Sequence, residues 1–210
     1  TKQSSSIIPS SFINPLPMNF AFMELFSAYT AQCNRNFDNL YVPFRCIASD
    51  VFNKRKLVCK SGDLGNAIRA SMSFPIVFKP IFKNGIPLFD GGIYDNFPVD
   101  VMRKEFAPEF IIGIDVSSAS SKINVNNLVD QVEAMVIQDH GTIIPDSIGV
   151  RMNLNLSSFG LLDFNKAKAI YQIGYDHTIE LIDSIKTRVS SRISQEARAI
   201  SRNSFKSKTP

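Results

Sequence analysis

Apolar and polar residues alternate with several different periods along this chain, and each change of period predicts a change of element. Apolar positions recur every three to four residues in several segments, which is the spacing of one face of an α-helix. These segments are residues 19–34, 64–73, 99–106, 125–140 and 166–187, with a further helical pattern over 189–200. Short apolar runs of strand length lie between them, at 44–51, 56–60, 76–78, 86–89, 110–116 and 148–156. The alternation of helices and strands predicts an α/β layered domain with a mostly parallel sheet.

Capping residues and prolines set the expected bounds of these elements. The prolines among Ser and Asn in residues 1–19 predict a loop. Asp63 is placed to cap the helix that follows it, and Pro75 ends that helix. Pro98 suits the first turn of the next helix because its missing N–H has no helical acceptor there.

The apolar runs on either side of Asn53 predict a β-hairpin. A hairpin centred between Phe52 and Asn53 places Cys46 opposite Cys59, whereas a tighter turn misaligns them. A disulfide and a pair of reduced, buried thiols are both compatible with this pattern. The odd number of cysteines and the lack of a C-x-x-C pair argue against a zinc site.

The composition of the chain indicates how large its core can be and shows that its charge is unevenly distributed. The chain has 210 residues, 44% hydrophobic and 20% charged, which suits one sizeable core and one domain. Its formal net charge is +4, but residues 186–210 hold seven Lys or Arg against one acid, Glu196. This basic tail indicates either a solvated helix face that runs into a linker or attraction to anionic lipid headgroups. Nucleic acid is not expected as a partner, because the tail has one aromatic residue, Phe205, and no stacking platform.

Asp90-Gly91-Gly92 is the most informative candidate site in the sequence. It follows an apolar run, so its carboxylate lies on a turn at a strand end. The glycines allow positive φ and a close approach of backbone or ligand. One interpretation is a simple Asp-Gly turn. The other is a general base whose partner is a hydroxyl or thiol nucleophile.

Two further carboxylates, Asp50 and Asp115, also follow predicted strands. Because ligands bind at the carboxyl ends of parallel strands, we expect both to share one rim with Asp90. The three could form a Mg²⁺ cage, but no D-x-D pair or phosphate-cradling Gly-Lys loop accompanies them. Turn and helix-cap roles are the alternative, and no metal is expected.

No nucleophile with a recognisable local signature lies in the sequence. The pattern G-x-S-x-G, which marks a strained strand-to-helix turn, occurs nowhere in it. Ser71 and Ser73 lie inside a predicted helix, which suits packing better than nucleophilic attack. The only histidines, His140 and His177, lack such a partner. Asp90 therefore indicates half of an active site.

Three segments in chain order, RASMSFP at 69–75, FDGGIYDNFP at 89–98 and residues 111–117, resemble the patatin-like phospholipase family. Residues 163–175 are similar to its closing helix, and the resemblance covers roughly residues 37–185. It implies an α/β, three-layer fold with a mostly parallel central sheet, incomplete at the N-terminus. The division expected from it is a loop plus helix at 1–36, the C-terminal part of a patatin-like domain at 37–187, and a basic helical tail at 188–210.

The same resemblance implies a lipid acyl hydrolase that uses a Ser–Asp dyad and no metal or organic cofactor. Asp90 is then the base, Gly91 and Gly92 shape its turn, and Asn96 ties the loop down. The serine is expected in the N-terminal segment of the same domain, outside this chain, so the chain alone is expected to be inactive. A non-catalytic lipid-binding or scaffold domain is the alternative.

The resemblance also implies a substrate and a location. A lipid or fatty-acyl ester would contact a wall of apolar side chains. The alternative is that these side chains only pack in the hydrophobic core. The candidate wall residues are Phe74, Ile76, Phe78, Phe82 and Phe97. Residues 44–50 and 205–210 are similar to a bacterial branch in which periplasmic repeats and an outer-membrane barrel follow. That branch implies a periplasmic or outer-membrane-associated protein whose basic tail contacts the membrane surface.

Overall fold

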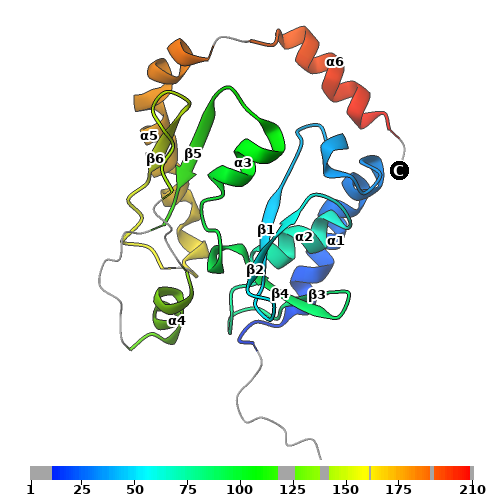
Figure 1. Ribbon diagram of the computed structural model, residues 1–210, viewed down its shortest axis with the longest axis vertical. Helices are drawn as coiled ribbons and strands as arrows, with labels where there is room; N and C mark the ends of the chain where they lie inside the picture. The colour runs from blue at the N-terminus through cyan, green and yellow to red at the C-terminus, as the bar shows by residue number, and fades with distance from the viewer. Residues whose placement is uncertain (1–10, 118–125, 138–141, 161, 190–191, 209–210) are drawn as a thin grey trace, which may run out of the picture. The chain divides into compact units, whose positions relative to one another are not determined.

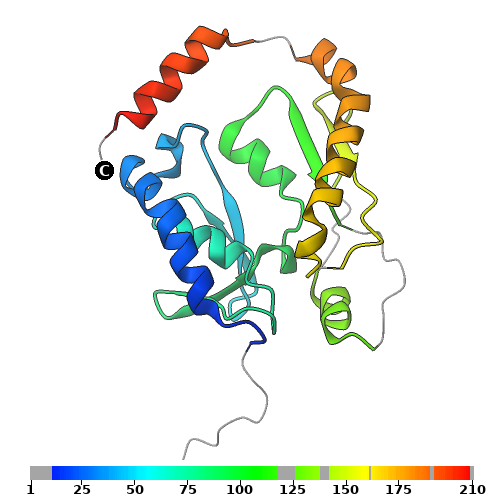
Figure 2. The same cartoon turned by 180° about the vertical axis from the view of Figure 1, so that it is seen from behind.

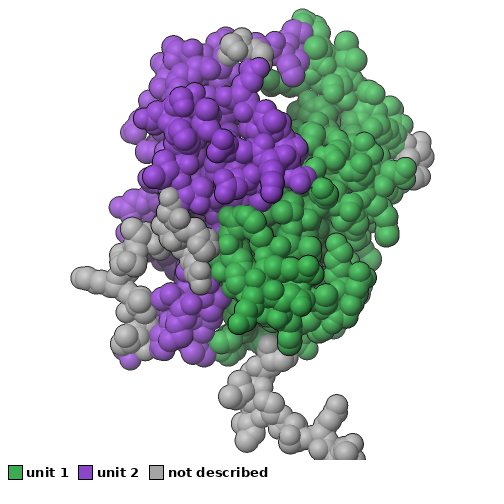
Figure 3. Space-filling view, in the orientation of Figure 1, with its two compact units in different colours: residues 1–95, 196–210 green, residues 96–195 purple. Residues whose placement is uncertain are grey.

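The computed structural model describes residues 11–208 except 118–125, 138–141, 161 and 190–191. The chain divides into two compact units, which Figure 3 shows in different colours. The first unit contains the residues up to Asp95 and those from Glu196 onward, and the second contains Asn96–Gln195. These bounds differ from the division at residues 36 and 187 that the sequence indicates, and that division stays a prediction.

The first unit is built on a four-stranded sheet in the order β2-β1-β4-β3 (Figure 1). The strands are β1 (Cys46–Asp50), β2 (Arg55–Cys59), β3 (Ile81–Lys83) and β4 (Ile86–Asp90). Every neighbouring pair is antiparallel. The expectation of a mostly parallel central sheet is therefore wrong for this unit. The reason is local, because two of its three strand pairs are joined by tight hairpins, and a hairpin connects antiparallel strands only.

Helices α1 (Pro15–Gln32) and α2 (Leu64–Ser71) belong to the same unit and pack on each other. The unit also contains the short 3₁₀ helices η1 (Phe37–Asn39) and η2 (Gly91–Ile93), and helix α6 (Gln195–Lys206) from the end of the chain. The buried core of this unit consists of Cys33, Phe37, Ala48, Cys59, Leu64, Ala67, Ala70 and Leu88.

The start of α2 shows how the sequence fixes this packing. Asp63 caps the helix as expected, since its Oδ1 accepts a hydrogen bond from the N–H of Asn66 at 2.7 Å. Thr30 of α1 accepts another from the N–H of Leu64 at 3.1 Å. Gly65 lets the helices approach closely, because a Cβ there would lie 3.1 Å from the carbonyl oxygen of Phe22. Two of the four orphan N–H groups at the start of α2 are thus satisfied, one by the cap residue Asp63 and one by Thr30 of α1.

Two sequence expectations in this unit need correction. Helix α1 begins at Pro15 rather than Asn19, since Asn14 caps it and prolines are tolerated in a first helical turn. Residues 76–78 form a turn rather than a strand, and the N–H of Phe78 donates to the carbonyl of Phe74 at 3.0 Å. The hairpin register is confirmed, because Cys46 pairs directly with Cys59.

The second unit contains α3 (Val99–Phe106), β5 (Ile111–Asp115), α4 (Leu128–Val136), β6 (Gly149–Asn153), the 3₁₀ helix η3 (Phe164–Lys166) and α5 (Ala167–Arg188). Strands β5 and β6 are parallel, so the expected parallel pairing is confirmed for this pair (Figure 1). Among the described residues, no helix has the combination of length and apolar character needed to cross a membrane.

Candidate active site

Asp90 is the last residue of β4 and the cap of η2, so it lies where a strand turns into a helical turn. Its Oδ1 accepts a hydrogen bond from the N–H of Gly92 at 2.8 Å. Its own N–H donates to the carbonyl of Ser73 at 3.0 Å, and it faces Ala48 across the sheet. The backbone and one carboxylate oxygen of Asp90 are therefore held in place on both sides.

The other carboxylate oxygen, Oδ2, makes no hydrogen bond within the described part of the chain. Burial raises the pKa of Asp90, and the hydrogen bond from Gly92 opposes this rise in part. A carboxylate with a raised pKa is a stronger proton acceptor than an ordinary surface aspartate. Asp90 thus combines a fixed position with one oxygen that can take up a proton.

Gly91 is required by a close approach of the β1 backbone. A Cβ at this position would lie 2.4 Å from the carbonyl oxygen of Ile47 and 2.9 Å from its carbonyl carbon. The carbonyl of Gly91 accepts a hydrogen bond from the hydroxyl of Ser49 at 3.5 Å. Neither Gly91 nor Gly92 has a positive φ. The close approach expected from the sequence is therefore present, and the positive φ is not.

The carbonyl that holds Asp90 belongs to a segment fixed by Arg69. This side chain is 1% exposed. Its Nη1 donates to the hydroxyl of Ser73 at 2.8 Å and its Nη2 to the carbonyl of Lys79 at 3.2 Å. Its Cζ lies 5.1 Å from the centre of the Phe78 ring. No carboxylate of the described residues pairs with it, and burial lowers its pKa. Arg69 begins the RASMSFP segment noted in the sequence, but the contacts of its guanidinium were not predicted.

The candidate acyl-wall residues of the first unit differ in environment. Phe74 and Phe78 are buried, whereas Phe82 on β3 is 67% exposed. Ile76 is partly buried and has a φ of 70°, which is rare for a β-branched residue. Its carbonyl accepts a hydrogen bond from the N–H of Phe12 at 2.9 Å, so the loop before α1 supports this conformation. A role in acyl binding stays a prediction for all four.

Asn96 and Phe97 belong to the second unit. Phe97 packs on the small buried cluster of that unit, and the guanidinium carbon of Arg151 lies 4.8 Å from its ring centre. Asn96 is exposed, and its side chain makes no hydrogen bond to the rest of the described chain. The roles expected for these two residues stay predictions.

The other two carboxylates have partners of their own. Asp50 ends β1 and accepts hydrogen bonds from Asn53 and Arg55 in the hairpin turn, which together lower its pKa. Asp50 and Asp90 end neighbouring antiparallel strands, and the register places Asp90 opposite Ala48, two positions before Asp50. The basis of the expected common rim, parallel strands that end at the same edge, therefore does not hold for this pair.

Asp115 ends β5 in the second unit and pairs with Arg151 of β6. Burial raises the pKa of Asp115, but hydrogen bonds from Ser117 and Arg151 outweigh burial and hold the pKa below its usual value. Within the described ranges, no three acidic, histidine or cysteine side chains gather in the way that a metal ion needs.

Among the described residues, no serine or histidine side chain forms a hydrogen bond or ion pair with Asp90. Ser49 and Ser73 are fully buried. The Ser73 hydroxyl donates to the carbonyl of Arg69 at 2.7 Å, so its proton is already engaged. His177 of α5 lies 3.7 Å from Glu180 on the same helix, and His140 lies outside the described residues.

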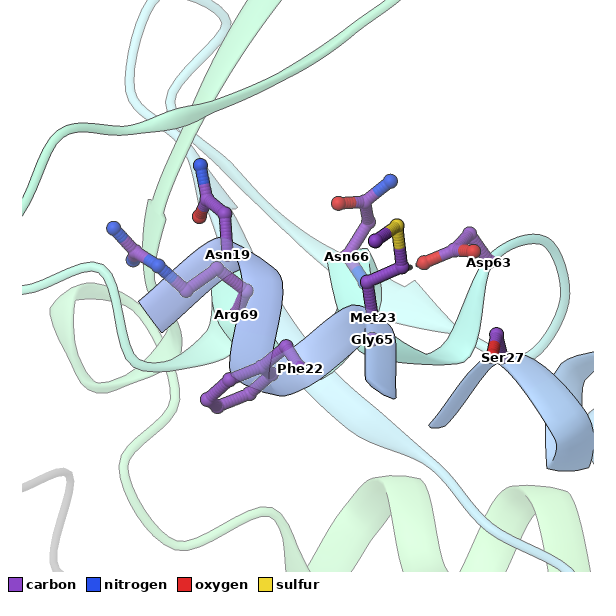
Figure 4. A pocket seen from close by; sticks show the side chains of 8 residues that line it. All are labelled: Asn19, Phe22, Met23, Ser27, Asp63, Gly65, Asn66 and Arg69. Atoms are coloured by element: carbon purple, nitrogen blue, oxygen red, sulfur yellow. Dashed lines mark hydrogen bonds between the residues drawn. The ribbon is translucent and has the colours of Figure 1, made fainter. Parts of the chain in front are cut away.

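A cavity of about 280 Å³ lies between α1 and α2 (Figure 4). Its lining residues are Asn19, Phe22, Met23 and Ser27 of α1, and Asp63, Gly65, Asn66 and Arg69 of the α2 segment. Neither Asp90 nor any candidate acyl-wall residue lines it. The cavity is thus separate from the predicted chemistry.

Comparison with known proteins connects these features to a family. Residues 13–103 match the family of patatin-like phospholipases. The chain is 28% identical over 179 residues to the lysophospholipase NTE1 of Meyerozyma guilliermondii, which covers 71% of this chain and 12% of that protein. It is 35% identical over 89 residues to NTE1 of Scheffersomyces stipitis, covering 42% of this chain and 6% of that protein.

A third relative is the putative patatin-like phospholipase domain-containing protein M110.7 of Caenorhabditis elegans. It is 24% identical over 190 residues, covering 73% of this chain and 17% of that protein. The chain therefore spans less than a fifth of the length of each of these relatives. The three come from two yeasts and a nematode, so the bacterial branch inferred from the sequence stays a prediction.

Proposed function

Since residues 13–103 of this chain match the patatin-like phospholipase family, we propose that the chain carries the aspartate half of a Ser–Asp dyad in a lipid acyl hydrolase. One observation carries the proposal. Asp90 is held by Gly92 and Ser73, has a pKa raised by burial, and keeps Oδ2 without a partner in the described structure. A structural Asp-Gly turn needs only the fixed position of the carboxylate. It needs neither a raised pKa nor an Oδ2 without a partner.

In this proposal Asp90 acts as a general base in two steps. Oδ2 takes the proton of a serine hydroxyl while the serine oxygen attacks the carbonyl carbon of a fatty-acyl ester. The proton passes to the leaving alcohol, and an acyl-serine remains. Asp90 then takes a proton from the water that attacks the acyl-serine, and returns it to the serine oxygen as the fatty acid leaves. The reaction needs no change of oxidation state.

The serine of the dyad is proposed to lie outside these 210 residues. The sequence contains no G-x-S-x-G pattern, and the hydroxyls of Ser49 and Ser73 are buried. The donors that stabilise the developing oxyanion would come from the same outside segment, and such donors contribute orders of magnitude in rate. The 210-residue chain alone is therefore expected to have almost no esterase activity.

The substrate class in this proposal is a lipid with a fatty-acyl ester. Ile76 and Phe82 are the candidate wall residues of the first unit that have surface to offer an acyl chain, since Phe74 and Phe78 are buried. The basic tail, residues 188–210, would bring the protein to an anionic membrane surface. A periplasmic or outer-membrane-associated location is part of the same proposal.

The test is active-site labelling with a fluorophosphonate, which reacts covalently with activated serines. The protein should be produced with the segment that supplies the G-x-S-x-G serine, as wild type, Asp90→Asn and Asp95→Asn. Asp95 is the matched control, because it lies five residues further on and its carboxylate pairs with Lys56 at 2.7 Å. We expect wild type and Asp95→Asn to label, and Asp90→Asn to label about 10²–10⁴-fold more slowly.

Three outcomes contradict the proposal. Equal labelling of wild type and Asp90→Asn would show that Asp90 is not the base. No labelling of the intact wild-type protein would favour the alternative, a lipid-binding or scaffold domain that lacks the activity. Labelling of the 210-residue chain by itself would show that the serine lies within it, against our assignment.

A further inference from the structure

The segment of residues 73–79, which lies between α2 and β3 along the chain, supports the backbone of the candidate base. The N–H of Asp90 donates to the carbonyl of Ser73 at 3.0 Å. Helix α2, which precedes the segment, lies between α1 and strands β1 and β4 (Figures 1 and 2). The position of Asp90 at the end of β4 therefore depends on how firmly the 73–79 segment is held.

One side chain, that of Arg69 in α2, bridges the two ends of this segment. Its Nη1 donates to the hydroxyl of Ser73 at 2.8 Å, and its Nη2 donates to the carbonyl of Lys79 at 3.2 Å. The Ser73 hydroxyl donates in its turn to the carbonyl of Arg69 at 2.7 Å. The planar fork of a guanidinium holds two acceptors in a fixed geometry, whereas a lysine ammonium is a single point on a flexible stem. Arg69 therefore fixes both ends of the 73–79 segment at once.

Stability alone does not account for an arginine at this position. The residue is 1% exposed, and no carboxylate of the described residues pairs with it. Its Nε is buried without a hydrogen-bond partner in the described structure. Burial lowers the pKa of the guanidinium, because the folded state disfavours its charge. An unpaired buried charge and an unmade hydrogen bond both destabilise a fold, so Arg69 must contribute something that packing does not require.

The 73–79 segment also contains strained backbone. Ile76 has a φ of 70°, and its β-branched side chain makes this left-handed conformation unfavourable. The carbonyl of Ile76 accepts a hydrogen bond from the N–H of Phe12 at 2.9 Å. Strain of this kind persists only where the surrounding structure enforces it, and it is concentrated at functional sites. The segment is thus held by Arg69 and by the loop before α1 in a conformation that Ile76 itself does not favour.

We propose that Arg69 is a positioning residue, which acts through Ser73 to fix the direction in which Asp90 presents Oδ2 to the serine of the dyad. Arg69 holds Ser73, the carbonyl of Ser73 holds the N–H of Asp90, and the N–H of Gly92 holds Oδ1. Oδ2 is then the oxygen left to accept a proton. The inference rests on the proposed function in one respect, the assignment of Asp90 as the base.

The test compares two buried arginines in the protein that includes the G-x-S-x-G segment. Arg69→Lys keeps the positive charge but not the fork that bridges Ser73 and Lys79. Arg45→Lys is the matched control, because the Arg45 side chain is 8% exposed in the same unit and pairs with Asp38 at 2.7 Å. Thermal unfolding of both variants is measured first, and activity is then measured at a temperature where both are folded.

We expect Arg69→Lys to react with the fluorophosphonate about 10–10²-fold more slowly than wild type, since a small misplacement of a reacting group slows the chemistry by this much. For a soluble acyl ester, kcat should fall by a similar factor while KM stays within about twofold, because substrate binding is not changed. Arg45→Lys should react at the wild-type rate.

A second variant keeps the test decisive if Arg69→Lys does not fold. Ser73→Ala removes the hydroxyl that Arg69 holds but keeps the carbonyl that holds Asp90, and it should slow labelling about tenfold. Where both single variants fold, the double variant should be no slower than the slower single variant, because both changes break the same contact.

Four results would overturn the inference. Arg69→Lys or Ser73→Ala labels as fast as wild type, both arginine variants slow labelling alike, or the effects of Arg69→Lys and Ser73→Ala multiply in the double variant. Loss of all labelling in Ser73→Ala would identify Ser73 as the reactive serine, against this inference and the proposed function together. Failure of the proposed function alone is distinct, because Asp90→Asn would then label like wild type. If Asp90→Asn labels slowly and Arg69→Lys labels normally, Asp90 remains the base and only the role of Arg69 is refuted.

Discussion

Replacement of Gly91 by alanine tests whether the turn that holds Asp90 depends on the β1 backbone behind it. The added Cβ would lie 2.4 Å from the carbonyl oxygen of Ile47, and ordinary contact begins at 3.4 Å. The two segments must therefore separate by about 1 Å. Gly91 does not have a positive φ, so contact rather than backbone strain decides the outcome.

The magnitude follows from what has to move. The clashing atom belongs to the backbone of β1, which is paired with β2 on one side and β4 on the other. Such overpacking costs about 1–3 kcal/mol. For a chain of this size, 1 kcal/mol shifts the Tm by about 2–4 °C. We therefore expect Gly91→Ala to lower the Tm of the first unit by roughly 2–12 °C in thermal unfolding followed by circular dichroism.

Gly174→Ala is the control of opposite sign. Gly174 lies inside α5, and a Cβ there would meet only the Leu154 side chain, at 3.6 Å. Alanine is favoured over glycine in a helix by about 1 kcal/mol, so this variant should gain stability. The reasoning is refuted if Gly91→Ala unfolds at the wild-type temperature, or if the two variants change stability in the same direction.

The remaining predictions concern single charged or thiol groups. Asp90→Asn should be more stable than the wild type at pH 7 and as stable as the wild type near pH 3, because a carboxyl group with a raised pKa destabilises the folded state only when it is ionised. If the variant and the wild type are equally stable at both pH values, this prediction is wrong. Oxidised glutathione should form a disulfide between Cys46 and Cys59, because the two residues are directly paired and a hydrogen bond from Cys46 lowers the pKa of Cys59 to about 7. Mass spectrometry should show that the mass of the protein falls by about 2 Da. A disulfide to the third cysteine would refute this prediction. Asp115→Asn should lose about 3 kcal/mol at pH 7, where Arg151 loses its charged partner. Because the pKa of Asp115 is lowered in the folded state, this ion pair stabilises the fold fully at pH values above the pKa of an unfolded aspartate and no longer does so at strongly acidic pH. If urea unfolding shows that Asp115→Asn loses the same free energy of unfolding at pH 2 as at pH 7, the ion pair is not the cause.

Local patterns predicted most helices and strands because each depends on residues close in sequence. The cap at Asp63 depends on the helix residues directly after it, and the register of Cys46 with Cys59 depends on the position of the hairpin turn between them. Strand direction was mispredicted because alternation of elements does not report which strands are joined by hairpins. Asn84-Gly85, a favoured hairpin turn, was the available signal for β3 pairing with β4.

The position of Asp90 could be predicted from the sequence, but the contacts of the residues around it could not. An Asp-Gly pair after an apolar run indicates a carboxylate at a strand end, and the structure has it there. The buried guanidinium of Arg69 depends on Ser73, Phe78 and Lys79, all within the segment that follows it. The left-handed backbone of Ile76 is supported by Phe12, which is distant in sequence. The spacing of apolar and polar residues predicts neither set of contacts.

The pH profile of kcat/KM for a soluble acyl ester tests the role of Asp90 most directly, in the protein that includes the G-x-S-x-G segment. We predict an acidic limb whose midpoint lies above the usual aspartate pKa of about 3.9, because the carboxylate must be ionised to accept the serine proton. Asp90→Asn should lose both the limb and most of the rate, while Asp95→Asn keeps both. An acidic limb that persists unchanged in Asp90→Asn would contradict the account.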